Sequence, residues 1–315
     1  MHRTRTKFAA RVNRVATGLE RRGIVATYEL HDRLLANRSS RRRFGSGPPQ
    51  LDDVQRDVLE RLRAEGYAML PFSELVPNPG VWQELEADAA RFAAETEVGL
   101  AREREGGESE LRRRAGKEFL VRKYSRGVEL GLDDPWLRLG TNLRLLDLAN
   151  AYLGMWSKLE YVDVWYTPPA GGDDRKASQR WHRDFNDRHL LKAFLYLVDV
   201  DEDTGPFEYV PKSAPGGELD QLWPWRPLGD NYPPDDEFAE RVNGRSVTFT
   251  APKGTLIFCN TSGFHRGGFA RLKPRVLATL TWDSPASLKA LSERNYAFVG
   301  ADGAALSEAQ RYALT

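Results

Sequence analysis

Apolar residues in the first half of the chain recur at spacings of three and four, the pattern typical of amphipathic helices. Across residues 51–66 they fall on one helical face, acidic residues occupy the first turn and Gly66 follows the last, so we expect a helix there. The same reasoning predicts a short strand over 66–72, helices over 79–95 and 135–154, and a loop or exposed helix over 101–116. The N-terminal half is therefore expected to be mainly helical.

After Gly154 the pattern changes to short apolar and β-branched runs separated by turn-forming residues. Strands are expected over 159–167, 192–200, 207–211, 246–250, 255–260 and 275–282. Because helical segments do not alternate with these strands, the pattern favours an antiparallel sandwich or jelly roll. A long insertion over 213–243 has a length typical of lids and binding loops. The predicted fold class is α+β with a mainly β core, against whose sheet the α-helical N-terminal half packs.

The chain has 315 residues, 41% of them hydrophobic, which fits one large domain with an extension. We assign 51–315 to a single domain and 1–50 to a basic helical N-terminal extension and linker. Residues 1–50 carry 12 Lys and Arg against 3 Asp and Glu, a balance of +9. This start could contact nucleic acid, anionic lipid or protein, but its spaced apolar residues favour a solvated helical arm, so no specific nucleic-acid binding is expected. The cluster Arg41, Arg42 and Arg43, followed by FGSGPP, has the composition of a linker.

No apolar run approaches the roughly 20 residues needed to cross a bilayer, and the N-terminus has no apolar core of a secretory signal. These features predict a cytoplasmic protein without a membrane span. The only cysteine, Cys259, excludes an internal disulfide and a thiolate metal cluster. Any bound metal must therefore take nitrogen and oxygen ligands.

The pair His182 and Asp184 has the spacing at which two side chains of an extended segment point to the same side. Both could reach one ion, and a third ligand must then come from elsewhere. His265, just after the apolar run TLIF, is the better candidate. His189 lies only five residues after Asp184 in a polar segment and is the weaker one.

Two imidazoles and one carboxylate form the facial triad of non-haem Fe(II) oxygenases, which leaves three sites open for cosubstrate and dioxygen. The same ligands could hold zinc in a hydrolase, which would need a general base nearby. A third reading is a hydrogen-bonded His and Asp without metal, in a non-catalytic small-molecule-binding jelly roll. The sequence offers no evident Glu or His base near the three residues, which favours the oxygenase.

Several motifs taken together resemble the phytanoyl-CoA dioxygenase family of 2-oxoglutarate-dependent oxygenases. They are WHRD at 181–184, DVDEDTGPFEYVPKSA at 199–214, YTPPAGG at 166–172 and an arginine ten residues after His265. The resemblance covers roughly 117–285, and RAEGYAMLPF at 63–72 is similar to the usual start of the family. It implies a double-stranded β-helix (jelly roll, cupin-like), with its β core at about 117–285, that uses Fe(II), 2-oxoglutarate and O2 and releases succinate and CO2.

The resemblance also implies roles for residues around the metal. Arg275 would grip the distal carboxylate of 2-oxoglutarate, a role that suits a planar guanidinium. Phe194 falls where a residue facing the cosubstrate is expected, and Asp163 falls on a strand that lines the same pocket. Gly267 is a further candidate beside the cosubstrate, and both Gly267 and Leu277 stand where some relatives have a hydroxyl that could bind it.

The carboxylate position separates two chemistries, because related halogenases carry Gly or Ala there and bind chloride at the iron. Asp184 fills this position, so hydroxylation or another oxidation of a small molecule, possibly in secondary metabolism, is expected. The candidates for substrate contact are Trp165, Lys117, Arg122 and Trp225. Their mixture of aromatic and charged groups favours a polar small-molecule substrate. The sequence does not indicate the oligomeric state.

Overall fold

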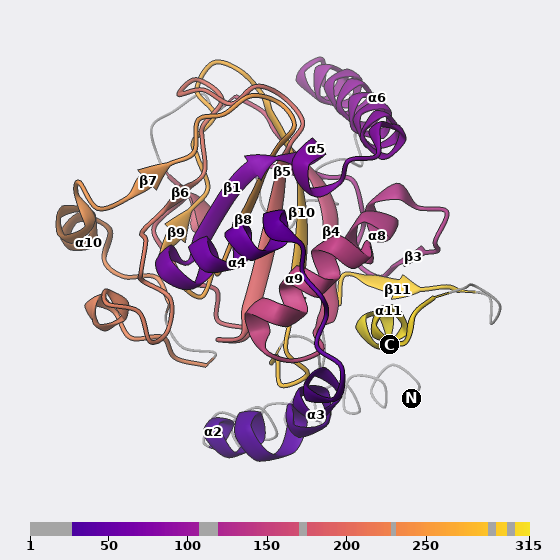
Figure 1. Cartoon of the computed structure of the whole chain (residues 1–315). Helices are drawn as coiled ribbons and strands as arrows, with labels where there is room; N and C mark the ends of the chain where they lie inside the picture. Colours follow the sequence, from indigo (N-terminus) through magenta and orange to yellow (C-terminus); the bar gives the residue numbers. More distant parts are fainter. Residues whose placement is uncertain (1–26, 107–118, 170–174, 228–230, 289–293, 301–305) are drawn as a thin grey trace, which may run out of the picture.

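The computed structural model describes residues 27–106, 119–169, 175–227, 231–288, 294–300 and 306–315. Its centre is a six-stranded sheet in which every neighbouring pair is antiparallel (Figure 1). In spatial order its strands are β1 (Tyr67–Pro71), β8 (Thr255–Cys259), β5 (Leu190–Tyr196), β10 (Arg275–Asp283), β4 (Lys158–Thr167) and β2 (Val121–Arg122). The predicted antiparallel sheet and the mixture of helix and sheet are therefore confirmed.

Two smaller sheets accompany the large one. The antiparallel sheet β7-β6-β9 consists of β7 (Val247–Thr248), β6 (Glu208–Tyr209) and β9 (His265–Arg266). The strands β3 (Val128–Leu130) and β11 (Tyr296–Phe298) form a parallel pair. Because β9 contains His265, the sheet β7-β6-β9 supplies one of the three candidate metal ligands.

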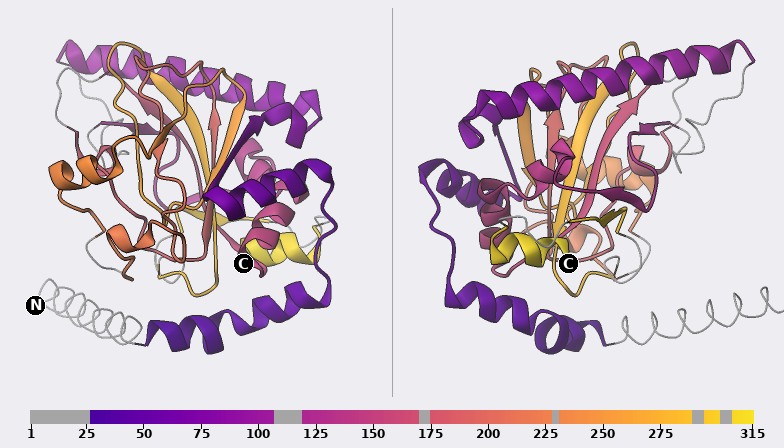
Figure 2. Two further views of the ribbon diagram at one scale, coloured as in Figure 1. Left: turned by 60° about the vertical axis from the view of Figure 1, so that its left-hand side comes forward. Right: turned by 90° about the vertical axis from the view of Figure 1, so that its right-hand side faces the viewer.

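Helices surround the large sheet. They are α4 (Asp53–Glu65), α5 (Phe72–Leu75), α6 (Pro79–Arg104), α8 (Pro135–Gly140), α9 (Leu143–Leu153), α10 (Asp235–Val242) and α11 (Glu308–Leu314). Figure 1 shows α4 and α9 in front of the sheet, and Figure 2 shows α6 running across one end of the strands. None of the described helices has the length and apolar character needed to cross a membrane.

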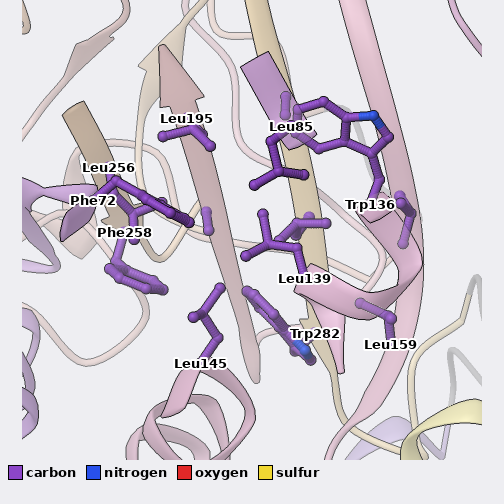
Figure 3. Packing of buried hydrophobic residues seen from close by; sticks show 14 of the residues in the cluster. Phe72, Leu85, Trp136, Leu139, Leu145, Leu159, Leu195, Leu256, Phe258 and Trp282 are labelled. Atoms are coloured by element: carbon purple, nitrogen blue, oxygen red, sulfur yellow. The ribbon is translucent and has the colours of Figure 1, made fainter. Parts of the chain in front are cut away.

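Side chains of the central strands alternate between the two faces of the sheet, apart from a register shift on β4 opposite Thr281 and Trp282. On β10, Val276, Ala278, Leu280 and Trp282 join the core under the helices. Arg275, Leu277, Thr279 and Thr281 therefore point to the opposite face. Figure 3 shows the helix side, where Trp136 and Leu85 pack above Leu139 and Trp282. The polar residues of the site thus share the other face of the sheet.

The local signals at the start of α4 agree with the prediction. Asp52 and Gln55 form a reciprocal capping box, and Gly66 ends the helix in the left-handed region with φ of 83°. Residues 135–154, in contrast, form two helices and not one. The break falls at Thr141 and Asn142, where the Asn142 side chain accepts a hydrogen bond from the Arg144 amide and starts α9. The periodicity alone did not reveal this cap.

Residues 28–46 form an arm, made of α2 (Tyr28–Leu30), η1 (His31–Ala36) and α3 (Arg38–Ser46), that runs along the end of the sheet opposite α6 (Figure 2). The helix α3 includes the arginine cluster that the composition had suggested as linker, so only the short segment after Ser46 is extended. The predicted amphipathic helix before residue 27 lies outside the described residues. The arm is the described part of the predicted extension.

Candidate metal centre and its two pockets

His182, Asp184 and His265 come together on the polar side of the large sheet. One potential ligand atom of each lies within 4.8 Å of the others. His265 belongs to β9, and His182 and Asp184 follow the short turn η2 (Ala177–Gln179). The backbones of the two histidines exchange two hydrogen bonds of 3.0 Å, and their ring centroids are 4.1 Å apart. The structure therefore brings together the three residues that the sequence selected.

The two imidazoles are oriented by carbonyl groups. Nδ1 of His182 lies 2.9 Å from the Arg180 carbonyl oxygen, and Nδ1 of His265 lies 3.0 Å from that of Gly263. Because a carbonyl can only accept, each Nδ1 must carry the proton, and Nε2 is the nitrogen with a lone pair for a metal. Carbonyl partners of this kind are typical of metal-binding histidines. The donor set fits a divalent metal with nitrogen and oxygen ligands.

Asp184 is held in place from several directions. Its carboxylate accepts hydrogen bonds from Lys192 Nζ at 2.5 Å and from the Thr261 hydroxyl, and Oδ2 lies 3.9 Å from His265 Nε2. Burial acts to raise its pKa, but the charge of the Lys192 ammonium outweighs this effect and holds the pKa of Asp184 well below its usual range. The carboxylate is thus charged and ready to bind a cation.

Two pockets meet at these residues. The smaller has a volume of about 80 Å³ and the larger about 230 Å³. Both are lined by Trp165, Ser178, His182, Asp184 and Lys192. Within the described residues that line them, the triad supplies the only imidazoles and the only carboxylate. A separate general base, which a zinc hydrolase would need, is not among them.

Arg275 lines the smaller pocket together with Phe194, Leu277 and Gly267. Its guanidinium is buried and donates to the Gly205 carbonyl, while Nε has no hydrogen-bond acceptor. In the described part of the chain no carboxylate is within ion-pair distance of Arg275. Burial without a carboxylate lowers the pKa of this guanidinium. A buried cation beside a small pocket is a strong signal for an anionic ligand, because an unpaired buried charge is costly.

The remaining predicted site residues are placed less centrally. Asp163 lines neither pocket, and its carboxylate accepts hydrogen bonds from the Tyr161 hydroxyl and the Tyr124 amide. Trp225 also lies outside both, although its indole donates to the Asp184 carbonyl at 2.8 Å. It lines a separate cavity of about 890 Å³ beside the arm. His189 binds Asp32 of the arm at 3.2 Å and is not part of the metal cluster.

Trp165 and Arg122 do line the larger pocket, and Lys117 lies outside the described residues. Sequence reasoning missed several pocket residues, namely Lys192, Ser178, Phe207, Thr279 and Thr281. A signal for three of them was present. Lys192 stands two residues before Phe194, and the threonines continue the two-residue period of Arg275 along β10. Ser178 and Phe207 lie outside the long strands, where no comparable period exists.

The structure combines antiparallel sheets with a His-x-Asp pair and a distant histidine whose ligand atoms lie close together. This arrangement is typical of proteins that bind one metal ion. Fe(II) is the metal that suits two imidazoles and one carboxylate when three coordination sites stay open. A model of the phytanoyl-CoA dioxygenase (PhyH) family matches residues 60–271, two thirds of the chain. The chain belongs to this family and is an Fe(II)/2-oxoglutarate-dependent oxygenase. The match includes the triad, and Arg275 lies just beyond its end. Among curated proteins, no sequence match is found.

Solved structures of similar shape include EctD from S. alaskensis in its apo form, at 18% identity over 74% of this chain and 77% of that chain, with a TM-score of 0.49. Another is the epimerase SnoN with Fe3+, alpha ketoglutarate and nogalamycin RO, at 22% identity over 73% and 83%, with a TM-score of 0.47. A third is HygX from Streptomyces hygroscopicus with iron bound, at 16% identity over 75% and 87%, with a TM-score of 0.45. All three scores are below 0.5, so no residue role is transferred from them.

Proposed function

We propose that this oxygenase hydroxylates an unactivated C–H bond of a small molecule. In this proposal His182, Asp184 and His265 hold Fe(II), and the smaller pocket holds 2-oxoglutarate with its distal carboxylate on Arg275. The observation that carries the proposal is the buried Arg275 without a carboxylate partner, beside the pocket that ends at the triad. When bound, Fe(II) and 2-oxoglutarate supply the activation of O2, with succinate and CO2 as products.

The protein groups have separate tasks in this scheme. The carbonyl contacts at Nδ1 fix both imidazoles, and Lys192 and Thr261 fix the carboxylate. Phe194, Phe207 and Leu277 surround the cosubstrate pocket with apolar surface, which excludes water and strengthens the interaction of Arg275 with an anion. The larger pocket, which shares His182 and Asp184 with the smaller one, would then hold the C–H bond beside the metal.

Three further parts of the proposal concern architecture and place. The two antiparallel sheets would form the double-stranded β-helix of the family, with residues 51–315 as one domain and 1–50 as an extension. The enzyme would act in the cytoplasm, as the single cysteine and the composition favour. A zinc-dependent hydrolase with the same three ligands lacks the general base it would need among the described lining residues, and metal replacement tests this alternative directly.

The direct test is anaerobic addition of Fe(II) and then 2-oxoglutarate, followed by visible spectroscopy. A chelated 2-oxo acid gives a charge-transfer band, and the absence of this band with folded protein would refute the proposal. Asp184→Ala should abolish succinate formation. Arg275→Gln should raise the 2-oxoglutarate concentration needed for half-maximal band intensity by roughly 10- to 100-fold, because a charged hydrogen bond contributes about 1.5–3 kcal/mol.

A matched control is Arg271→Gln, because Arg271 is an exposed arginine four residues before Arg275. This variant should need the same 2-oxoglutarate concentration as the wild type. Equal effects of the two substitutions would remove Arg275 from the cosubstrate site. Substrate turnover that survives with zinc in place of iron, without succinate formation, would favour the hydrolase.

A further inference from the structure

The larger pocket at the triad holds a second arginine without a carboxylate partner. Arg122 is partly buried on β2, and its Nε is shielded from solvent and has no hydrogen-bond acceptor. The described residues place no carboxylate within ion-pair distance of this guanidinium, which instead lies over the Tyr161 ring at 5.8 Å. A charge in this position favours a ligand of opposite sign.

The acidic residue that acts on Arg122 electrostatically is already engaged. Asp163 accepts hydrogen bonds from the Tyr161 hydroxyl at 2.8 Å, the Tyr124 amide at 3.2 Å and the Val164 amide at 2.9 Å. It does not line the pocket, so it cannot replace a ligand there. Lys192 also lines the pocket, but its charge is already paired with Asp184 at 2.5 Å. The remaining arginine, Arg183, is paired with Asp220 at 2.9 Å.

Two hydroxyl groups face the same space. Thr279 and Thr281 line the pocket, and the Oγ1 atom of each is buried without a hydrogen-bond partner. A buried hydroxyl without a partner costs free energy, and it can donate to an acceptor on a ligand. Arginine and threonine donors around one space form a typical site for a carboxylate or phosphate.

Aromatic rings form the walls of this pocket. Trp165 meets Tyr161 edge-on at 6.1 Å between centroids, and Tyr232 is stacked on His182 at 5.1 Å with an angle of 8° between the rings. Flat surfaces of this kind pack against a flat or apolar molecular body. The volume of about 230 Å³ restricts the part of the ligand that is enclosed to a small molecule.

We propose that the larger pocket binds a substrate with an anionic group, a carboxylate or a phosphate, held by Arg122 with Thr279 and Thr281. Its flat or apolar part lies between Trp165 and Tyr232, beside the triad. This inference rests on the proposed function, because it gives the smaller pocket to 2-oxoglutarate. Each of the two arginines then binds a different anion. Arg275 takes the cosubstrate and Arg122 takes the substrate.

The test uses benzoate, phenyl phosphate and the neutral benzamide as probes. Each is titrated calorimetrically into full-length protein loaded anaerobically with Fe(II) and saturating 2-oxoglutarate, and also into metal-free protein. We expect at least one anion to bind about 10-fold or more tightly than benzamide, in line with a charged hydrogen bond. Arg122→Gln should remove this preference, and Arg122→Lys should keep part of it. Arg126→Gln, at an exposed arginine nearby, should keep all of it.

The outcomes separate this inference from the proposed function. If the charge-transfer band forms but both anions bind no better than benzamide, or bind Arg122→Gln as well as wild type, the substrate class is wrong and the function stands. If Arg122→Gln raises the 2-oxoglutarate requirement while Arg275→Gln does not, the two pockets are assigned the wrong way round. If the band never forms, the proposed function is refuted, and the titration of metal-free protein still decides whether Arg122 binds anions.

A further variant, Thr281→Val, leaves the arginine in place. It should weaken anion binding and leave benzamide binding unchanged.

Discussion

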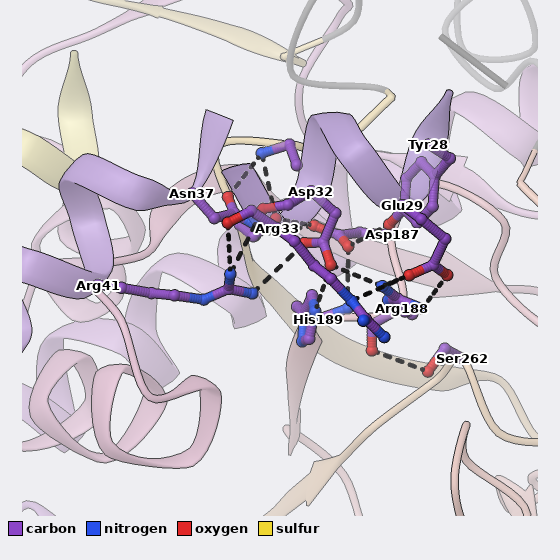
Figure 4. Close-up of polar contacts among 12 residues, drawn as sticks. Tyr28, Glu29, Asp32, Arg33, Asn37, Arg41, Asp187, Arg188, His189 and Ser262 are labelled. Carbon is purple, nitrogen blue, oxygen red and sulfur yellow. Dashed lines mark hydrogen bonds and ion pairs between the residues drawn. The ribbon is translucent and has the colours of Figure 1, made fainter. Parts of the chain in front are cut away.

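Asp32 of the arm binds Arg188 and His189, in the segment that follows His182 and Asp184. Its replacement by alanine should lower the free energy of unfolding. Figure 4 shows this carboxylate between Asn37 of the arm and the pair Arg188 and His189. It is only 1% exposed and lies 2.5 Å from Asn37 Nδ2, 2.7 Å from Arg188 Nη2 and 3.2 Å from His189 Nε2. Asp32→Ala removes these three contacts and the longer ion pair with Arg41 at 3.6 Å, and it leaves the partly buried Arg188 with one partner fewer.

The magnitude follows from these contacts. Breaking a buried ion pair by removing one partner costs about 3–5 kcal/mol. Arg188 is 20% exposed and keeps Glu29 at 2.6 Å, so the cost here should be lower, about 2–3 kcal/mol. Burial acts to raise the pKa of Asp32, but His189 and Arg188 outweigh it and hold the pKa well below its usual range. A depressed pKa stabilises the folded state above the unfolded pKa of about 3.9 and loses this contribution as the pH falls.

The assay is urea unfolding of wild type and Asp32→Ala, followed by circular dichroism at pH 7 and at acidic pH. The difference in unfolding free energy should be about 2–3 kcal/mol at pH 7 and should shrink below about pH 4. Asp57→Ala is the control, because Asp57 pairs with Arg61 on the surface of α4 with both side chains more than half exposed. Its effect should stay below about 1 kcal/mol. A loss of under about 1 kcal/mol for Asp32→Ala would refute the reasoning.

Two further predictions concern the site and its surroundings. Burial raises the pKa of Asp163 to about 6, so the folded state binds more protons than the unfolded state and stability should fall by up to about 3 kcal/mol as the pH rises from about 4 to 6. Asp163→Asn should flatten this part of the profile in urea unfolding, and an unchanged slope would assign it to another group. His265→Ala should lose Fe(II) binding in equilibrium dialysis while His189→Ala retains it, because His189 binds Asp32 and not the metal cluster. The reverse result would exchange the two as ligands.

Much of the fold and the metal cluster could be predicted because their signals are local or periodic. The acidic first turn of α4 and the glycine after its last turn lie within a short segment, and the two-residue spacing placed His182 and Asp184 on one side. His265 could be selected by elimination among few histidines, and its neighbourhood to Asp184 is confirmed. Each of these inferences needed only a short stretch of sequence or a very small set of candidates.

The features that were missed depend on contacts between distant segments. Gly140 ends α8 where a side chain would meet Leu159 of β4, and the carbonyl of Gly140 accepts from the Trp282 indole. The sequence around Gly140 does not predict either contact, because both partners are distant in the chain. Trp225, a candidate for substrate contact, lies outside both pockets and donates a hydrogen bond to the Asp184 carbonyl, a contact that only the tertiary structure reveals. Aromatic residues in a long insertion have many possible partners, so composition could not select one.

The two backbone hydrogen bonds between His182 and His265 determine when the metal centre forms during folding. These residues lie far apart in the chain, and the segment between them includes β5, β6 and β8. A long closed loop of this kind forms late and slowly, because its entropy must be lost before its contacts form. The complete ligand set thus exists only after the strands have assembled. Metal would therefore slow unfolding without accelerating folding, and metal loss would shorten the lifetime of the native chain.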